Sequence, residues 1–185
     1  MIKKLLSTIL FAVILLSTSV STFGYNLSQP CGLSEHELSK RLKYDLVQYA
    51  DDFLKAENEH GVNACFLAAV ASLESGHGRY CFRPNNIFGW SGKSFESVPA
   101  CIDYVAEKFK TNYISPDGKY YRGGTIADIG KIYCPGNEEW VRLVAGIFES
   151  LSEKPKEIKK INDFGGELCT IPMTHFPISI DMKMN

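Results

Sequence analysis

Apolar residues recur along this chain at the spacing of one face of a helix. They return every three or four positions in five stretches, and glycine, proline and asparagine residues separate these stretches. The pattern predicts a mainly α fold of about five helices with little or no strand. The five stretches cover residues 34–60, 63–75, 97–112, 125–133 and 137–151.

Capping residues mark the two ends of the first predicted helix. Ser34 and Glu37 have the spacing of a capping box, in which each side chain bonds the backbone N–H of the other residue. We expect the helix to run to about His60, where Gly61 ends it. One stripe of this helix is apolar and is expected to face inward: Leu38, Leu42, Leu46, Tyr49 and Phe53.

The second predicted helix, at residues 63–75, is apolar on nearly all sides. A helix of this kind is buried, and Gly76 and Gly78 stop it. Thr125 and Asn137 cap the last two helices. The residues expected to face inward from the third and the last helix are Cys101, Ile102, Val105, Phe109, Val141, Val144, Phe148 and Leu151.

The first 24 residues have the pattern of a secretory signal peptide. Two lysines precede an apolar run of about a dozen residues, and small residues follow it. The run is short for a membrane span, which needs about 20 apolar residues. We therefore expect export to the cell wall, the periplasm or the extracellular space, the alternative being an uncleaved anchor. The expected organisation is a signal peptide at 1–24, one domain at 25–155 and a C-terminal extension of unknown role at 156–185.

Charge and composition narrow the class of protein. The 185 residues include 20 Lys and Arg against 21 Asp and Glu, a net charge of -1. Because a nucleic-acid-binding surface is strongly basic, we expect no nucleic-acid partner. Apolar residues make up 45% of the chain and charged residues 22%, as in ordinary globular domains.

Six cysteines remain after the predicted signal peptide. An even number in an exported chain favours disulfides. The chain contains no C-x-x-C pair, so we expect no zinc site. Six cysteines allow 15 pairings. One hypothesis joins Cys81 to Cys134, which flank the motif loops, and an equally open one joins Cys31 to Cys169 in the two tails.

Glu74 closes the apolar second helix. It lies one turn after Val70 and two turns after Leu67, so it shares their apolar face. Burial disfavours a charged carboxylate, and so does the negative end of the helix dipole. We therefore expect a raised pKa, as a general acid working near neutral pH requires. The alternative is a solvated glutamate at a helix end.

The segment Asn85-Asn86-Ile87-Phe88-Gly89-Trp90 places two amides and two aromatic rings in six residues. Amides hydrogen-bond sugar hydroxyl and acetamido groups, and aromatic faces pack on sugar rings. We expect Asn85, Asn86, Phe88, Trp90 and Tyr80 to form the substrate-binding site. Within it, Asn86 and Phe88 shape the site, and Trp90 or Tyr80 touches the ligand.

These motifs occur in the order of a known family. Glu-Ser-Gly-x-Gly at residues 74–78, followed at this distance by Asn-Asn-x-Phe-Gly at 85–89, resembles the bacterial glucosaminidase domain. This is glycoside hydrolase family 73 (mannosyl-glycoprotein endo-β-N-acetylglucosaminidase-like), of the lysozyme-like superfamily. The resemblance covers about residues 45–151. The other matching positions are Phe66, Ser72, Leu73, Phe95, Ser97, Tyr104, Tyr113, Tyr133, Trp140 and Val141.

The resemblance implies a lysozyme-like fold that cleaves the bond between N-acetylglucosamine and N-acetylmuramic acid in peptidoglycan. Glu74 matches the family's general acid, and Tyr133 matches a tyrosine that lines its catalytic centre. The implied partners are peptidoglycan glycan strands, with no cofactor, and we expect a monomer that has no membrane contact in its mature form. His77 follows Glu74 at the spacing of a metal motif in helical bundles, but the second copy that such sites need is missing, so no metal is expected.

The chain departs from the family in one respect. Many members carry a β-hairpin lobe with a second glutamate after the Asn-Asn-x-Phe-Gly loop, and here only residues 90–96 stand in its place. The second carboxylate is therefore open among Glu96, Asp103, Asp117 and Glu138. Either the acetamido oxygen of the substrate acts as nucleophile, or a distant acid positions water. Two other functions are also open: a lytic transglycosylase, and a non-catalytic protein that binds the cell wall.

Overall fold

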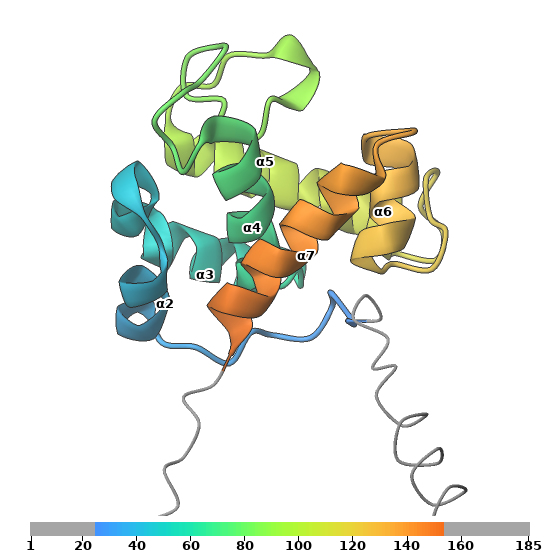
Figure 1. Cartoon of the computed structure of the whole chain (residues 1–185), viewed down its shortest axis with the longest axis horizontal. Helices are drawn as coiled ribbons and strands as arrows, with labels where there is room; N and C mark the ends of the chain where they lie inside the picture. Colours follow the sequence, from blue (N-terminus) through green and yellow to red (C-terminus); the bar gives the residue numbers. More distant parts are fainter. Residues whose placement is uncertain (1–24, 154–185) are drawn as a thin grey trace, which may run out of the picture. The chain divides into compact units, whose positions relative to one another are not determined.

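The computed structural model describes residues 25–153, and the elements within this range are all helical (Figure 1). Six α-helices and no strand occur in this part of the chain, which confirms the mainly α prediction. No helix in the described range is long and apolar enough to cross a membrane. The predicted signal peptide at 1–24 and the C-terminal extension at 156–185 lie outside the described residues.

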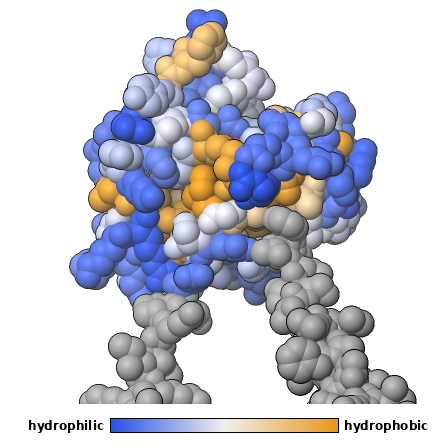
Figure 2. Space-filling model, viewed as in Figure 1, coloured by the Kyte–Doolittle hydropathy of each residue, from blue (hydrophilic) through white to orange (hydrophobic). Residues whose placement is uncertain are grey.

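Helix α4 (Ala64–Ser75) lies at the centre of the fold, as its composition predicts. Its first nine residues are all buried, because α3 (Ala50–His60) and α7 (Glu138–Ser152) pack against it. Helix α5 (Val98–Phe109) packs on α3, and α6 (Ile126–Tyr133) packs on α7. The face shown in Figure 2 is mostly hydrophilic, with apolar side chains gathered near its middle.

The single helix predicted over residues 34–60 is wrong, because the chain breaks it into three pieces. Helix α2 (Glu35–Arg41) is followed by a 3-10 helix, η1 (Tyr44–Tyr49), and then by α3. The break lies at Lys43, which is extended, and at Tyr44, whose φ is 48°. It turns α2 so that Arg41 donates to the carbonyl of Leu151, at the end of α7.

The predicted inward stripe survives this break. Leu38, Leu42, Leu46 and Phe53 are buried, although they come from separate elements, while Tyr49 is only half-buried. The reason is that each short helix keeps its apolar residues toward the same core. Apolar spacing alone therefore identifies the buried residues but not the continuity of the helix.

The other helix ends follow the capping signals closely. The capping box of Ser34 and Glu37 is present, and Gly61 and Gly76 end α3 and α4 at φ of 64° and 56°. The third helix is shorter than predicted, because α5 ends at Phe109 and continues as one π turn, η3 (Lys110–Ile114).

The segment before α2 packs closely against the start of α4. Leu27 is fully buried, its carbonyl accepts from the backbone N–H of Asn63 at 2.8 Å, and the Asn63 side chain donates to the carbonyl of Gln29 at 2.8 Å. Glu57 is also buried here and accepts from the backbone N–H groups of Cys31 and Ala64, each at 2.7 Å. One carboxylate thus joins the segment 25–33 to the first turn of α4.

Candidate active site

A pocket of about 310 Å³ opens at the C-terminal end of α4. The elements that form it are the end of α4, the loop that leads into the short 3-10 helix η2 (Trp90–Gly92), the π turn η3 and the end of α6. Its walls combine one carboxyl group with several aromatic rings. The lining residues are Glu74, Phe88, Gly89, Trp90, Ser91, Tyr113, Tyr133 and Cys134.

Glu74 is held by one hydrogen bond and is approached closely by a loop. The indole Nε1–H of Trp140 donates to Oε1 at 2.8 Å. Near the other carboxyl oxygen lies Gly89, whose φ of 62° brings the loop so close that an added Cβ would stand 3.5 Å from Oε2. A glycine here therefore lets the loop backbone approach the carboxyl group.

The electrostatic setting of Glu74 has the predicted direction. Burial by the surrounding atoms raises the pKa of its carboxyl, and the hydrogen bond from Trp140 partly opposes that rise by favouring the ionised form. Glu74 as a whole residue is nevertheless exposed, unlike Leu67 and Val70 on the same helix, so the expected burial applies only in part and a proton can be exchanged with water. A carboxyl with a raised pKa that opens onto a pocket can act as a general acid.

Aromatic rings form the wall beside Glu74. The ring centroid of Tyr133 lies 5.2 Å from that of Trp140 and 5.9 Å from that of Trp90. The rings of Phe109 and Tyr113 extend this cluster toward the core, with centroids 5.5 Å and 6.4 Å from Tyr133. The wall is thus an outgrowth of the hydrophobic core, which holds the rings in place.

Tyr133 is a hydrogen-bond donor in this wall. Its hydroxyl donates to the carbonyl of Phe88 at 2.9 Å. Burial raises the pKa of the phenol, and the nearby charge of Glu74 adds to the rise, so the phenol stays protonated. Tyr133 therefore ties the end of α6 to the loop that faces Glu74.

The two predicted amides hold the same loop from within. Asn86 is buried; its Oδ1 accepts from the backbone N–H of Trp90 at 2.9 Å, and its Nδ2 donates to the carbonyls of Trp90 and Lys93 at 3.1 and 2.8 Å. Asn85 donates to the carbonyls of Phe95 and Glu96. Both amides are therefore engaged with backbone groups, which fits the expectation that Asn86 shapes the site.

The remaining predicted site residues divide between the pocket and the outer surface. Phe88 is fully buried and presents its backbone to the pocket, while Trp90 is half-buried in the wall. Tyr80 is 69% exposed and is not a lining residue; Arg79 lies between it and Tyr44, 3.9 Å from the ring centroid of Tyr44. The pocket thus unites Glu74 with Phe88, Trp90 and Tyr133, while Asn85, Asn86 and Tyr80 are not among its lining residues.

Trp140 is the residue whose contact the sequence reasoning missed. It matched the family pattern, but nothing in its neighbours indicates that its indole reaches a carboxyl 66 positions away. Tyr113, Ser91 and Cys134 also line the pocket without having been assigned to it. Their positions depend on the packing of η3 and α6, which no local pattern encodes.

Glu74 supplies the sole carboxyl group among the residues that line this pocket. Glu96 is exposed and does not line it. Asp117 is likewise exposed, and Glu138 lines an adjoining pocket that shares only Cys134 with the first. Trp90–Gly92 form the short η2 turn, and residues 93–96 follow without a strand, as expected for a chain without the β-hairpin lobe.

The five cysteines of the described range are free thiols. Cys81 and Cys134 are not bonded to each other, and Cys169 lies outside the described residues. Both pairings suggested by the sequence therefore stay predictions.

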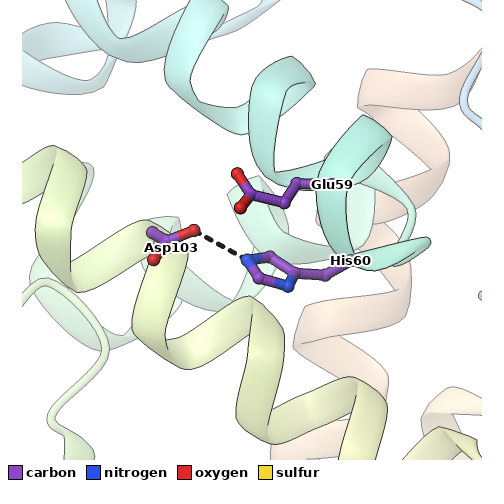
Figure 3. A group of neighbouring side chains, drawn as sticks. All are labelled: Glu59, His60 and Asp103. Carbon is purple, nitrogen blue, oxygen red and sulfur yellow. Dashed lines mark hydrogen bonds and ion pairs between the residues drawn. The ribbon is translucent and has the colours of Figure 1, made fainter.

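A second cluster of polar side chains lies between α3 and α5 (Figure 3). The Nε2 atom of His60 stands 2.7 Å from Oδ1 of Asp103, and Glu59 points toward the pair, with one potential ligand atom of each residue within 4.8 Å of the others. His60 is half-buried. The His60–Asp103 contact joins the two helices, and the cluster shares no residue with the pocket.

No protein-family model matches the chain, and the search of curated proteins gives no match. The resemblance to the glucosaminidase domain therefore rests on the motifs themselves and on the site that they build.

Proposed function

We propose that this protein is an exported peptidoglycan hydrolase that cleaves the β-1,4 bond between N-acetylglucosamine and N-acetylmuramic acid, with Glu74 as general acid. The observation that carries the proposal is the setting of Glu74, whose pKa is raised by burial and whose carboxyl is fixed by Trp140 beside a pocket with aromatic walls. The order of the motifs between residues 66 and 141, which resembles the glucosaminidase domain, supports the same reaction.

The reaction needs a proton at the glycosidic oxygen as the bond breaks. Protonated Glu74 donates it, the C1–O bond breaks, and water then adds its hydroxyl to C1 while its proton restores the acid. The raised pKa keeps more of the carboxyl protonated near neutral pH than would be protonated in a glutamate with the ordinary pKa. Trp90 and Tyr113 offer aromatic faces for the sugar rings, and Tyr133 positions the loop through Phe88.

A pocket with a single lining carboxyl favours the substrate's acetamido oxygen as the group that attacks C1, because no second carboxyl borders the pocket to do so. The same observation also suits a lytic transglycosylase, which uses one glutamate and forms an anhydro product. This is the second candidate function.

The test is a digest of purified peptidoglycan, followed by borohydride reduction and mass spectrometry of the products. Glu74→Gln keeps the size of the side chain but removes its proton, so we expect at least a 100-fold loss of product. Glu96→Gln is the matched control, because it makes the same change in an exposed acid outside the pocket and should retain activity.

Each result selects one function. Reduced N-acetylglucosamine ends from the wild type, lost in Glu74→Gln, establish a glucosaminidase with Glu74 as its acid. Anhydro-muramic ends establish the transglycosylase. If the folded wild type releases nothing from several wall types, the hydrolase proposal fails in favour of a wall-binding protein. An equal loss in Glu96→Gln assigns the second carboxylate to Glu96.

A further inference from the structure

Two cysteines that are distant in sequence meet at the first turn of α4. The backbone N–H groups of Cys31 and of Ala64, the residue before Cys65, donate to the same Glu57 oxygen, each at 2.7 Å. The two backbones are therefore held on either side of one atom. The Cys31 sulfur lies 3.6 Å from the other Glu57 oxygen, and the thiols of Cys31 and Cys65 hydrogen-bond to each other.

We propose that Cys31 and Cys65 form a disulfide, which fastens the segment 25–33 to the start of α4. The proposal rests on the contact between the two sulfurs and on the shared Glu57 anchor, and it is independent of the hydrolase activity. Closing the contact to an S–S bond of about 2.0 Å requires the two sulfurs to move together. Cys31 can make this movement, because it lies in a segment outside any helix.

The two thiols differ in the direction of their pKa shifts and in their exposure to solvent. Their hydrogen bond raises the pKa of Cys31 and lowers that of Cys65. The charge of Glu57 adds to the rise at Cys31. Cys31 is only half-buried whereas Cys65 is fully buried, so an oxidant reaches the sulfur of Cys31.

The oxidant is an exchangeable disulfide, such as oxidised glutathione or the disulfide of a thiol oxidoreductase. The Cys31 thiol gives up its proton as its sulfur attacks this disulfide and expels one of its thiolates. The thiolate of Cys65 then attacks the Cys31 sulfur of the mixed disulfide and expels the second. One S–S bond forms as one breaks, and the two thiol protons pass to the two thiols released from the oxidant.

The expected consequence is mechanical support for the helix that carries Glu74. Cross-linking residues 31 and 65 closes a loop of intermediate length, which restricts the unfolded chain. From the usual dependence on loop length and domain size, reduction should lower the melting temperature by about 10 °C.

A peptide map of the wild-type protein tests the pairing directly. Cleavage after lysine and arginine places the six cysteines in six separate peptides, so every pairing gives a distinct mass. The full chain is equilibrated in a glutathione buffer, its free thiols are alkylated, and it is digested without reduction. We expect the peptide that ends at Lys40 to be joined to the peptide 56–79. A link between Cys31 and Cys169, or alkylation of both Cys31 and Cys65, overturns the proposal.

Thermal unfolding provides a second measurement. We expect Cys31→Ala and Cys65→Ala to melt below the oxidised wild type and to show no response of this bond to dithiothreitol. Cys101→Ala is the control, because Cys101 is equally buried but should keep the response. If dithiothreitol leaves the melting temperature of the wild type unchanged, the proposal is wrong.

Discussion

Replacing Trp140 with phenylalanine removes the indole N–H that donates to Glu74 while keeping an aromatic ring in the wall. This hydrogen bond favours the ionised form of Glu74, because a charged carboxylate accepts a hydrogen bond more strongly than a neutral carboxyl group does. Its loss must therefore raise the pKa of Glu74 further. The substitution removes the one contact that lowers the pKa of Glu74, so the direction of the expected pKa change is fixed.

The size of the effect follows from the surroundings of the carboxyl. A hydrogen bond to a charged group contributes roughly 1.5–3 kcal/mol when water cannot replace it. Glu74 reaches solvent, so water recovers part of this, and we expect about 1 kcal/mol, or roughly a fivefold gain in proton affinity.

The rise in the pKa of Glu74 determines how both stability and activity depend on pH. Because the folded pKa already exceeds the ordinary value of 4.5, the folded state binds this proton more tightly than the unfolded chain does. The stability that the proton contributes is present below that ordinary value and is lost as the pH rises through the folded pKa. In Trp140→Phe this loss should be larger and should extend to higher pH. The alkaline limb of hydrolysis should move to higher pH as well.

Carbon-13 NMR of glutamate labelled at the side-chain carboxyl measures the pKa directly, and Glu74→Gln assigns the resonance. Trp90→Phe is the matched control, because it changes a ring of the same wall and leaves the Trp140 hydrogen bond in place. A pKa of Glu74 that falls or stays constant in Trp140→Phe would refute the assigned role of the indole.

Two further predictions concern stability and are measured by urea denaturation. Asn86→Ala leaves the N–H of Trp90 and two carbonyls without their buried partner, so we expect a loss of about 3 kcal/mol; a loss below 1 kcal/mol would contradict its role in the loop. Gly130→Ala drives a methyl group into Val141 where α6 meets α7, and should cost about 1–3 kcal/mol. Gly146→Ala is its control, because the site is open and lies within α7; it should stabilise by about 1 kcal/mol, and equal effects at both sites would argue against this packing.

The sequence predicted the features that depend on a residue and its near neighbours in the chain. The caps of α2, α4, α6 and α7 follow from a side chain and the backbone next to it, so the sequence suffices to place them. The raised pKa of Glu74 was also predictable, because the apolar character of α4 indicates burial at its end.

Long-range contacts account for what the sequence could not predict. Arg41, at the end of α2, donates to the carbonyl of Leu151, more than a hundred positions away. The same holds for the Trp140 hydrogen bond and for the anchoring of residues 25–33 on Glu57. Periodicity describes one element at a time, whereas each of these features belongs to a pair of elements.

The aromatic wall places the protein's tryptophan fluorescence at the candidate site. The chain contains two tryptophans, and both adjoin the same pocket: Trp90 lines it and Trp140 bonds its carboxyl group. All of the protein's tryptophan emission therefore originates at the site. A glycan that enters the pocket, or a proton that binds Glu74, should alter the intensity or colour of that emission. The protein thus carries its own unlabelled optical reporter of occupancy and of the protonation of its acid.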